Sequence, residues 1–330
     1  MGLRGYIIKR VVYTFVLIIA VITVNFLIFN LMPGNPIQQY VMSLRGRITE
    51  ERLQRLERAY GLDKPLIERY FLTIVNMLTF NFGISWQSGD PFAKMILTPL
   101  VNTLILMGIS TILSIVVGII IGTLCAARRG GIFDSTMVLL SLATYSVPIY
   151  FIAWTVILIF GIQLKWFPTG GIEPHEWGRN PPTNIFEVIT GRIPYLILPT
   201  LTLFVFTVGG WILLTRATVL ESITEDYVVT AKAKGLPERT ILYKHVLKNA
   251  APPLLTQIVL SLASMIGGAI ITETCFSYNG MGLLTWRAIY PVPDLPLLNA
   301  LFYVMALAVI IGNFIADLLY GVVDPRIRYG

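Results

Sequence analysis

Six apolar runs, each long enough to cross a lipid bilayer as a helix, constrain this chain more than any other feature of its sequence. A helix of about 20 residues spans the roughly 30 Å hydrocarbon core of a bilayer. Strands of a membrane barrel need only about ten residues and alternate in polarity, so the lengths favour helices. The sequence therefore predicts an all-α polytopic membrane protein with six transmembrane helices, at residues 11–31, 101–127, 137–160, 195–215, 254–272 and 297–321.

Composition excludes the main alternatives to a membrane protein. Charged residues make up 13% of the 330 residues, about half of the usual share, and 55% are hydrophobic. A soluble globule of this size could not cover its surface with so few charges, and aromatic residues at 12% argue against disorder. Two cysteines are too few for a disulfide scaffold, and we expect Cys125 and Cys275 to lie on opposite sides of the membrane, unable to pair.

Basic residues predict the orientation of the spans. Six spans place both termini on one side, which carries 13 of the 25 Lys and Arg residues and six acidic residues, a net charge of +7. Eight of the other 12 basic residues fall in the long segment 32–100, and long translocated segments count little in the positive-inside rule. We therefore expect cytoplasmic N- and C-termini and treat the net charge as a topology signal, with no nucleic-acid partner. The first run is too long for a signal peptide and is expected to remain as an anchor.

The predicted topology divides the chain into three parts. Residues 1–31 form an N-terminal transmembrane anchor, and residues 32–100 form an extracytoplasmic segment. That segment is expected to hold two amphipathic helices, one capped by Thr49 and one at residues 66–78, packed against the membrane surface or a partner. Residues 101–330 form a five-helix core, in which the Gly118/Gly122 spacing favours close helix packing. The core includes a cytoplasmic loop at residues 216–253.

This cytoplasmic loop reads as a helical hairpin. Thr224 is predicted to cap a short helix with acidic residues at its start and Lys232 and Lys234 at its end, as the helix dipole favours. Gly235 suits a left-handed residue after the helix, and a second helix is expected to stop before Pro252. Small residues around this turn, Ala231 among them, permit close approach of another backbone, so we favour a docking surface over a solvated connection.

Catalytic and metal-binding motifs are absent from the sequence. It contains no Gly-Lys pair and hence no phosphate-binding loop, and no G-x-S-x-G, H-E-x-x-H or C-x-x-C motif. We therefore expect no catalytic residues, no metal site and no enzyme activity. Two acids are possible structural or pathway groups: Glu273 at the end of a span and Asp317 inside one. For Asp317 we favour a structural role with an interhelical hydrogen bond over proton coupling.

The cytoplasmic hairpin resembles that of permease subunits of ATP-binding-cassette (ABC) importers, and specifically the first permease of the oligopeptide/dipeptide/nickel group. The resemblance covers nearly the whole chain and depends on the order and spacing of several short motifs. Two positions depart from the group: Val229, where Arg is usual, and Asn279, where many relatives have Pro. The matching segments are Thr215–Ala217, Glu225–Leu236, Pro33-Gly34-Asn35-Pro36, Gly61–Pro65, Ala127–Gly130 with Asp134, Glu273–Phe276, Gly280–Gly282, Asp317–Tyr320 and Asp324–Arg326.

The resemblance implies a type I ABC importer permease fold in the cytoplasmic (inner) membrane. It also implies four kinds of partner besides the bilayer: a second related permease, two ABC ATPase subunits that use ATP and Mg, and an extracytoplasmic solute-binding protein. The chain itself would bind no cofactor. The residues that would couple it to an ATPase are Glu225, Asp226, Tyr227, Thr230, Ala231, Ala233, Lys234, Gly235 and Leu236.

The sequence defines the transported solute less closely than it defines the kind of transporter. Short peptides are the commonest cargo of the group, and we place them ahead of oligosaccharides or nickel. No cluster of His or Met in the spans argues for a metal. The competing class is a self-contained membrane protein, either a secondary carrier or an intramembrane enzyme that uses Asp317 and Glu273 as its acids.

Overall fold

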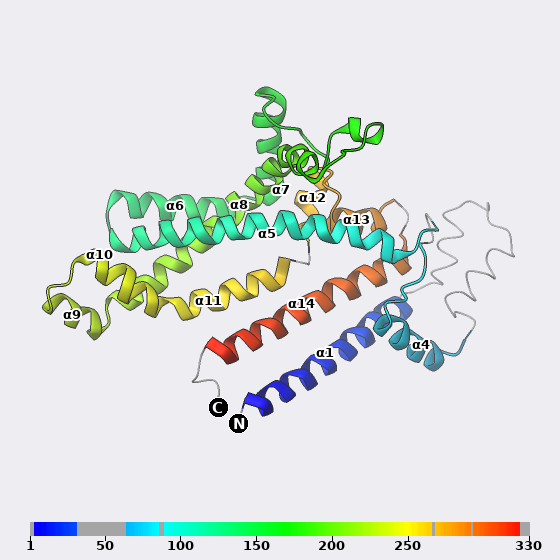
Figure 1. Ribbon diagram of the computed structural model, residues 1–330, viewed down its shortest axis with the longest axis horizontal. Coiled ribbons are helices and arrows are strands. Elements are labelled where there is room, and N and C mark those ends of the chain that lie inside the picture. Colours follow the sequence, from blue (N-terminus) through cyan, green and yellow to red (C-terminus); the bar gives the residue numbers. More distant parts are fainter. Residues whose placement is uncertain (1–2, 32–63, 86–88, 266–267, 292, 324–330) are drawn as a thin grey trace. The chain divides into compact units, whose positions relative to one another are not determined.

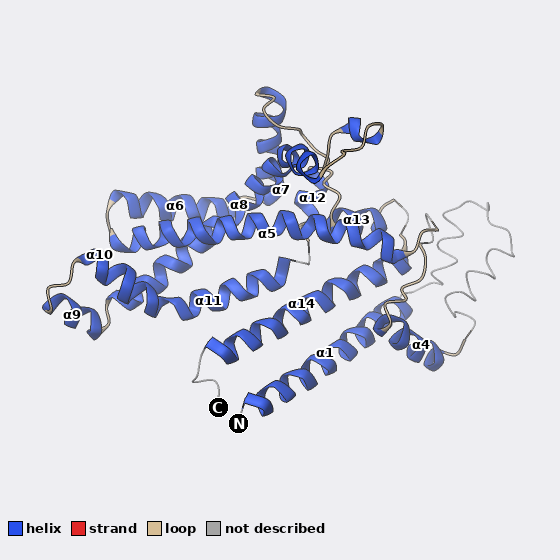
Figure 2. Ribbon diagram, viewed as in Figure 1, coloured by secondary structure: helices blue, strands red, loops and turns tan. Residues whose placement is uncertain are grey.

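The computed structural model describes the chain apart from residues 1–2, 32–63, 86–88, 266–267, 292 and 324–330 (Figure 1). Across these described ranges the regular structure is helical, and the β-type pairing is one isolated bridge between Ile84 and Pro91 (Figure 2). The helix predicted after Thr49 lies outside the described residues. The elements are α1 (Leu3–Leu31), α4 (Leu66–Leu78), α5 (Phe92–Ala127), α6 (Ile132–Ser146), α7 (Ile149–Val156), η1 (Ile157–Gln163), η2 (His175–Gly178), α8 (Ile185–Ile223), α9 (Asp226–Ala233), α10 (Glu238–Thr240), η3 (Ile241–Val246), α11 (Leu247–Ser264), α12 (Ile270–Cys275), α13 (Met281–Ile289) and α14 (Leu295–Val323).

Five of the described helices are long and apolar enough to cross a membrane, or six if one bent pair is a single span. The bent pair corrects the prediction of one helix at residues 137–160. Helix α6 and the α7–η1 segment meet at 100°. Val147 is extended there (φ −80°, ψ 129°), as expected before Pro148, whose ring disfavours a helical conformation of the preceding residue. The third apolar run is therefore broken in its middle.

Helix α11 corrects two predicted boundaries, and the first correction shows that not every proline breaks its helix. Helix α11 continues through Pro252 and Pro253, so the second helix of the hairpin does not stop there but joins a candidate span from Glu238 to Ser264. The predicted span at 254–272 divides, because α11 ends at Ser264 and α12 begins at Ile270. Transmembrane helices tolerate proline where neighbouring groups replace the lost hydrogen bond.

Helix α8 is longer than predicted at both ends. It begins at Ile185, where the side chain of Asn184 accepts a hydrogen bond from the Glu187 backbone N–H (2.9 Å), and it passes through Pro194 and Pro199. It ends at Ile223, eight residues beyond the predicted end of the span. The connection between the predicted spans at 137–160 and 195–215 is correspondingly shorter, and the cytoplasmic hairpin begins directly at a long helix.

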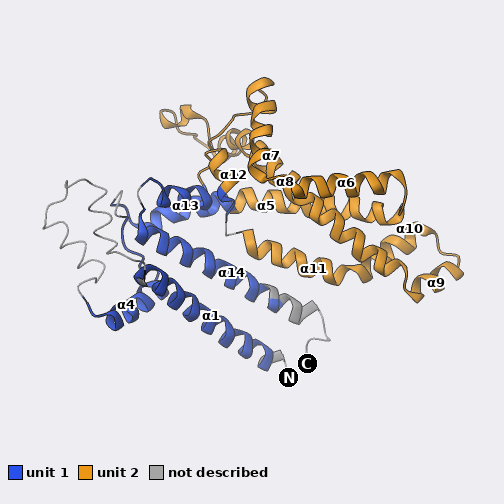
Figure 3. Cartoon of the chain, turned by 180° about the vertical axis from the view of Figure 1, so that it is seen from behind, with its two compact units in different colours: residues 1–103, 266–270, 280–330 blue, residues 104–265, 271–279 orange. Residues whose placement is uncertain are grey.

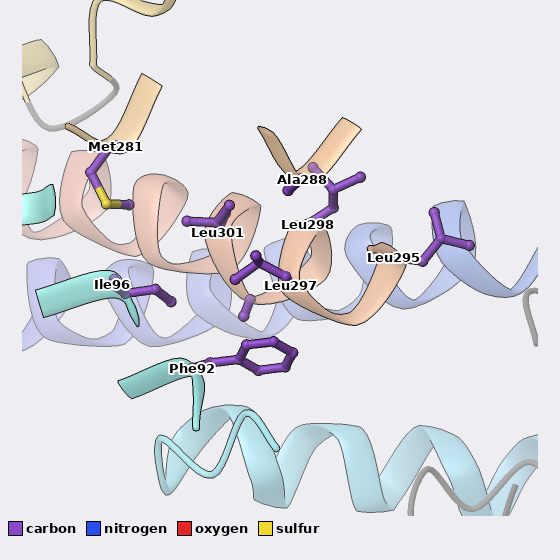
Figure 4. Close-up of a cluster of buried hydrophobic side chains, with 9 residues drawn as sticks. Phe92, Ile96, Met281, Ala288, Leu295, Leu297, Leu298 and Leu301 are labelled. Carbon is purple, nitrogen blue, oxygen red and sulfur yellow. The ribbon is translucent and has the colours of Figure 1, made fainter. Parts of the chain in front are cut away.

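The chain divides into two compact units (Figure 3). Unit 1 comprises residues 1–103, 266–270 and 280–330, and its largest hydrophobic cluster joins the start of α5 to α13 and α14 (Figure 4). In this cluster Phe92 and Ile96 of α5 pack with Met281 of α13 and Leu301 of α14. The Met281 backbone N–H donates to the buried Thr103 hydroxyl at 2.8 Å, which fixes the start of α13 against α5.

Unit 2 comprises residues 104–265 and 271–279 and is organised around α8. The backbone of α5 approaches α8 closely at Gly118 and Gly122. A Cβ atom at Gly122 would lie 2.6 Å from the Thr215 Cβ, and one at Gly118 would overlap the Cβ of Trp211. These contacts confirm the close packing predicted from the glycine spacing.

Candidate functional site

The cytoplasmic hairpin is built around α9, which follows α8 after a short break. The chain turns at Glu225, whose backbone is extended (φ −74°, ψ 149°) immediately before the first residue of α9. Thr224 does not cap α9 as predicted. It ends α8, and its hydroxyl donates to the Glu221 carbonyl at 2.7 Å. The two helices are thus joined by two residues, Thr224 in a helical conformation and the extended Glu225.

The C-terminal end of α9 has the predicted left-handed glycine. Gly235 has φ +72°, its N–H donates to the Lys232 carbonyl (2.9 Å), and the Leu236 N–H donates to the Ala231 carbonyl (3.3 Å). This pair of bonds forms a Schellman motif, which satisfies carbonyls that a helix end otherwise leaves free. No atom lies within 4 Å of a Cβ built at Gly235, so within this chain the glycine serves backbone conformation and not space.

One face of α9 packs against the chain's own core. Val228 is 2% exposed and Ala231 is 7% exposed. They form a cluster with Val219 of α8, Ile241 and Val246 of η3, Ala250 of α11 and Ala126 of α5. The small side chain of Ala231 is therefore accounted for by packing within the chain, and its burial leaves it little surface for a partner. This cluster fixes α9 to the ends of three long helices.

The opposite face of α9 is exposed. Asp226, Val229, Thr230 and Ala233 share it at helical spacing, and Val229 is 65% exposed. Tyr227 lies at the edge, with its hydroxyl donating to the Ser222 carbonyl of α8 at 3.0 Å. The remaining predicted residues Glu225, Lys234 and Leu236 are also exposed, so all predicted coupling residues except Ala231 and the half-buried Tyr227 lie on the surface. We call Asp226, Val229, Thr230 and Ala233 the outer face of α9.

An ion pair with a buried carboxylate lies at the base of the hairpin, between two residues that were not predicted as site residues. The Arg216 guanidinium of α8 binds Asp134 of α6 through two contacts, Nε to Oδ1 at 2.6 Å and Nη2 to Oδ2 at 2.8 Å. Asp134 is 2% exposed, and its Oδ2 also accepts the Gly130 backbone N–H at 2.9 Å. Bidentate Arg–carboxylate pairs are geometrically specific. Both residues lie in segments that resemble the permease group, and this resemblance is the one signal in the sequence that could have identified them.

Asp317 is held by the first helix of the chain. Its Oδ2 lies 2.6 Å from Nη1 of Arg10, and its backbone carbonyl accepts a hydrogen bond from the Tyr6 hydroxyl at 3.0 Å. These contacts join α1 to α14 within unit 1.

Glu273 is fully buried in unit 2, on α12. Its backbone carbonyl accepts the Tyr278 N–H at 2.8 Å. Burial raises the pKa of Tyr278 and the Glu273 carboxylate raises it further, while Arg192 opposes the shift. The two predicted acids belong to different units, each engaged within its own. Among the described residues, no group of three or more His, Cys, Asp or Glu side chains could hold a metal ion.

Comparison with family models covers nearly the whole chain. A model described as "Binding-protein-dependent transport system inner membrane component" matches residues 114–329. A second, described as the N-terminal part of a "Binding-prot-dependent transport system membrane comp", matches residues 3–107. The first match includes the α9 hairpin, the Asp134–Arg216 pair and both candidate acids.

Individual relatives match over their full length. The chain is 33% identical to the oligopeptide transport system permease protein AppB of Bacillus subtilis, over 99% of this chain and 100% of that protein. It is 32% identical to the dipeptide transport system permease protein DppB of Escherichia coli K12, over 98% of each. A solved structure of the MetNI methionine ABC transporter, in inward-facing conformations, has a TM-score of 0.55 at 16% identity and covers 70% of this chain and 97% of that one. This likeness confirms the permease fold.

Proposed function

The chain belongs to the family of binding-protein-dependent transport system inner membrane components, and we propose that it is a permease subunit of an ATP-driven importer of short peptides. The observation that carries this function is the end-to-end match with permeases named for oligopeptide and dipeptide transport. The oligosaccharide and nickel alternatives have no comparable support. The chain lies in the membrane as a multi-pass protein, in the inner membrane under this proposal, with both termini in the cytoplasm.

In this proposal the outer face of α9 docks on an ABC ATPase subunit. Docking needs an exposed surface, and coupling needs that surface to be held firmly by the helices that move. The outer face meets the first requirement through Val229 and its neighbours, and the Val228–Ala231 packing meets the second. The Asp134–Arg216 pair also links α6 to α8 just before the hairpin, so force on α9 would reach both helices.

The chain's partners in this proposal are a second related permease, two ATPase subunits and an extracytoplasmic solute-binding protein. ATP and Mg are used by the ATPase subunits, and the permease itself has no catalytic residues. The broken α6–α7 segment and the close α5–α8 packing would belong to the body that moves when the ATPases close, because both lie in the same compact unit as α9.

Purification of the tagged chain from its native membrane tests the assembly. We expect two ATPase subunits and a second permease to co-purify, with uptake that requires ATP. A chain that transports alone and without ATP would show instead the secondary carrier considered above.

A separate titration tests the cargo. We expect the cognate solute-binding protein to bind members of a panel of short peptides and to stimulate ATP hydrolysis by the importer when loaded. Tight binding of an oligosaccharide with no response to peptides would overturn the cargo and leave the importer assignment standing.

A further inference from the structure

Helix α4 (Leu66–Leu78) has the residues predicted for the second amphipathic helix, but its packing is unusual for a helix outside the membrane. Its 13 residues extend about 20 Å, too short to cross a bilayer. It lies within unit 1 against α1 (Figure 1).

The contacts of α4 reach well down the transmembrane helix α1. Arg69 donates a hydrogen bond to Asn30, at the end of the apolar span Gly5–Asn30. Tyr70 contacts residues further along α1: its hydroxyl lies 2.8 Å from the Thr23 hydroxyl, and its ring packs edge-on against Phe26 with centroids 5.3 Å apart. Thr23 is seven residues before Asn30, about 10 Å along the helix axis. The Tyr70 side chain of α4 therefore reaches about 10 Å inside the end of the span.

The far end of α4 is buried at the same depth. Met77 is 7% exposed and packs with Ile22 of α1 and Tyr303 of α14 in one hydrophobic cluster. Ile22 is adjacent to Thr23, so the helix stays at this level over its length instead of rising away from the membrane. The inward side of α4 thus makes both polar and apolar contacts within unit 1.

The outward side of α4 is apolar. Ile67, Phe71, Val75 and Leu78 follow one stripe along the helix, at spacings of four, four and three residues, and are between 41% and 66% exposed. We call these four residues the outer stripe of α4. The neighbouring row of the helix carries Glu68, which binds Lys64 at 2.6 Å, and the exposed Asn76, with the exposed Leu72 between them. A helix in water would expose its polar residues, and four large apolar side chains in one row mark a different neighbour.

We propose that α4 is an interfacial helix whose outer stripe inserts into the lipid leaflet at the C-terminal end of α1. Three observations favour lipid over water or a protein partner. The helix contacts α1 at membrane depth, and interfacial helices bury an apolar face about 5–10 Å into the headgroup and acyl boundary. The neighbouring surface of α1 is itself apolar and exposed, at Val24, Leu27 and Ile28, so lipid that covers α1 extends onto α4. The neighbouring row with Glu68 and Asn76 then faces water.

This inference depends on neither cargo nor ATPase, since it concerns only how unit 1 sits in the bilayer. In the orientation proposed above, α4 would occupy the outer leaflet and anchor the segment that follows the first span. Lipid contact along this stripe would also hold the α1–α4–α14 arrangement at a fixed depth while unit 2 responds to the ATPases.

Spin labels on α4 test the proposal in the assembled importer in lipid nanodiscs. Nitroxides are attached in separate variants at Phe71→Cys, Val75→Cys and Asn76→Cys, all exposed positions, and the parental chain with Cys125 and Cys275 gives the background. Collision with oxygen, which concentrates in lipid, is compared with collision with a water-soluble nickel chelate. We expect the oxygen-to-nickel ratio at positions 71 and 75 to exceed that at position 76 several-fold.

Two other outcomes would overturn the proposal. High accessibility to the nickel chelate at positions 71 and 75 would place the outer stripe in water. Low accessibility to both reagents at these positions would show that a protein partner covers it. Because all three labels lie on one 13-residue helix, a local distortion would change the three readings together and would not produce the expected contrast.

Discussion

Two adjacent valines in α9 allow the proposed docking surface to be tested separately from folding. Val228 is 2% exposed and lies in the cluster that holds the hairpin, whereas Val229, one residue on, is 65% exposed on the outer face. We predict that Val228→Ala lowers stability with little direct effect on the docking surface. Val229→Ala should weaken ATPase binding without lowering stability.

The structure gives magnitudes for both changes. Val228→Ala removes two buried carbons at about 0.8 kcal/mol each, and a partly unfilled cavity raises the cost to about 2 kcal/mol. Val229→Ala removes carbons that are largely solvated in the isolated chain, so its effect on unfolding should stay within about 0.5 kcal/mol. If the ATPase covers these carbons, the loss is about 1 kcal/mol of binding free energy, roughly a fivefold fall in affinity.

The assay needs two measurements on each purified variant. Thermal melting of the permease in detergent reports stability, and titration of the permease complex with the ATPase subunit reports docking. Val228→Ala should lower the melting temperature and Val229→Ala the affinity. Equal affinity of the parental chain and Val229→Ala, together with normal uptake, would refute the assignment of the outer face.

Three further predictions concern the base of the hairpin, its turn and the core of unit 2. Asp134→Asn should destabilise the chain by about 3 kcal/mol, because it leaves Arg216 without its charged partner, and Arg216→Lys should also lower the melting temperature, because lysine keeps the charge but cannot make the bidentate contact. Gly235→Val should lose about 1–2 kcal/mol at the end of α9, with more rapid amide exchange there, whereas Gly235→Asn should lose less, because only backbone conformation is constrained. Gly118→Ala should lower the melting temperature, whereas Gly108→Ala on the same helix, with no atom within 4 Å of its Cβ, should leave it unchanged or raise it; equal melting of the two variants would contradict the close α5–α8 packing.

Local patterns predicted local structure well. The helix at 66–78 has the bounds that its amphipathic pattern indicated, and the end of α5 at Ala127 follows from the change from apolar residues to Arg128. The left-handed Gly235 was predictable because a helix end with a following Pro237 favours it. Each of these features depends on residues within one or two helical turns.

Proline positions show where such patterns fail. Pro148 interrupts a membrane run, but Pro252 and Pro253 lie inside a continuous helix. Hydropathy cannot distinguish these cases, because the outcome depends on whether tertiary neighbours hold the preceding residue helical.

Contacts between residues far apart in the sequence could not be predicted either. Ala231 was predicted to face a partner, yet it packs against Ala250 and Ile241 of its own chain, a contact that follows only from the hairpin's return. Asp134 and Arg216 were counted as cytoplasmic charges of opposite sign, and their pairing across 82 residues gave no local pattern. Val229 is not among the predicted coupling residues, although it is the most exposed large apolar side chain on the outer face.

Photo-cross-linking from α9 tests the central claim most directly. The photoreactive residue p-benzoylphenylalanine replaces Val229 in the importer in its native membrane, with Phe186, an exposed residue at the start of α8, as the matched control position. We predict that light produces an adduct between the permease and an ABC ATPase subunit from position 229 and none from position 186. An importer that remains active with the probe at position 229 but gives no ATPase adduct would contradict the proposed docking surface.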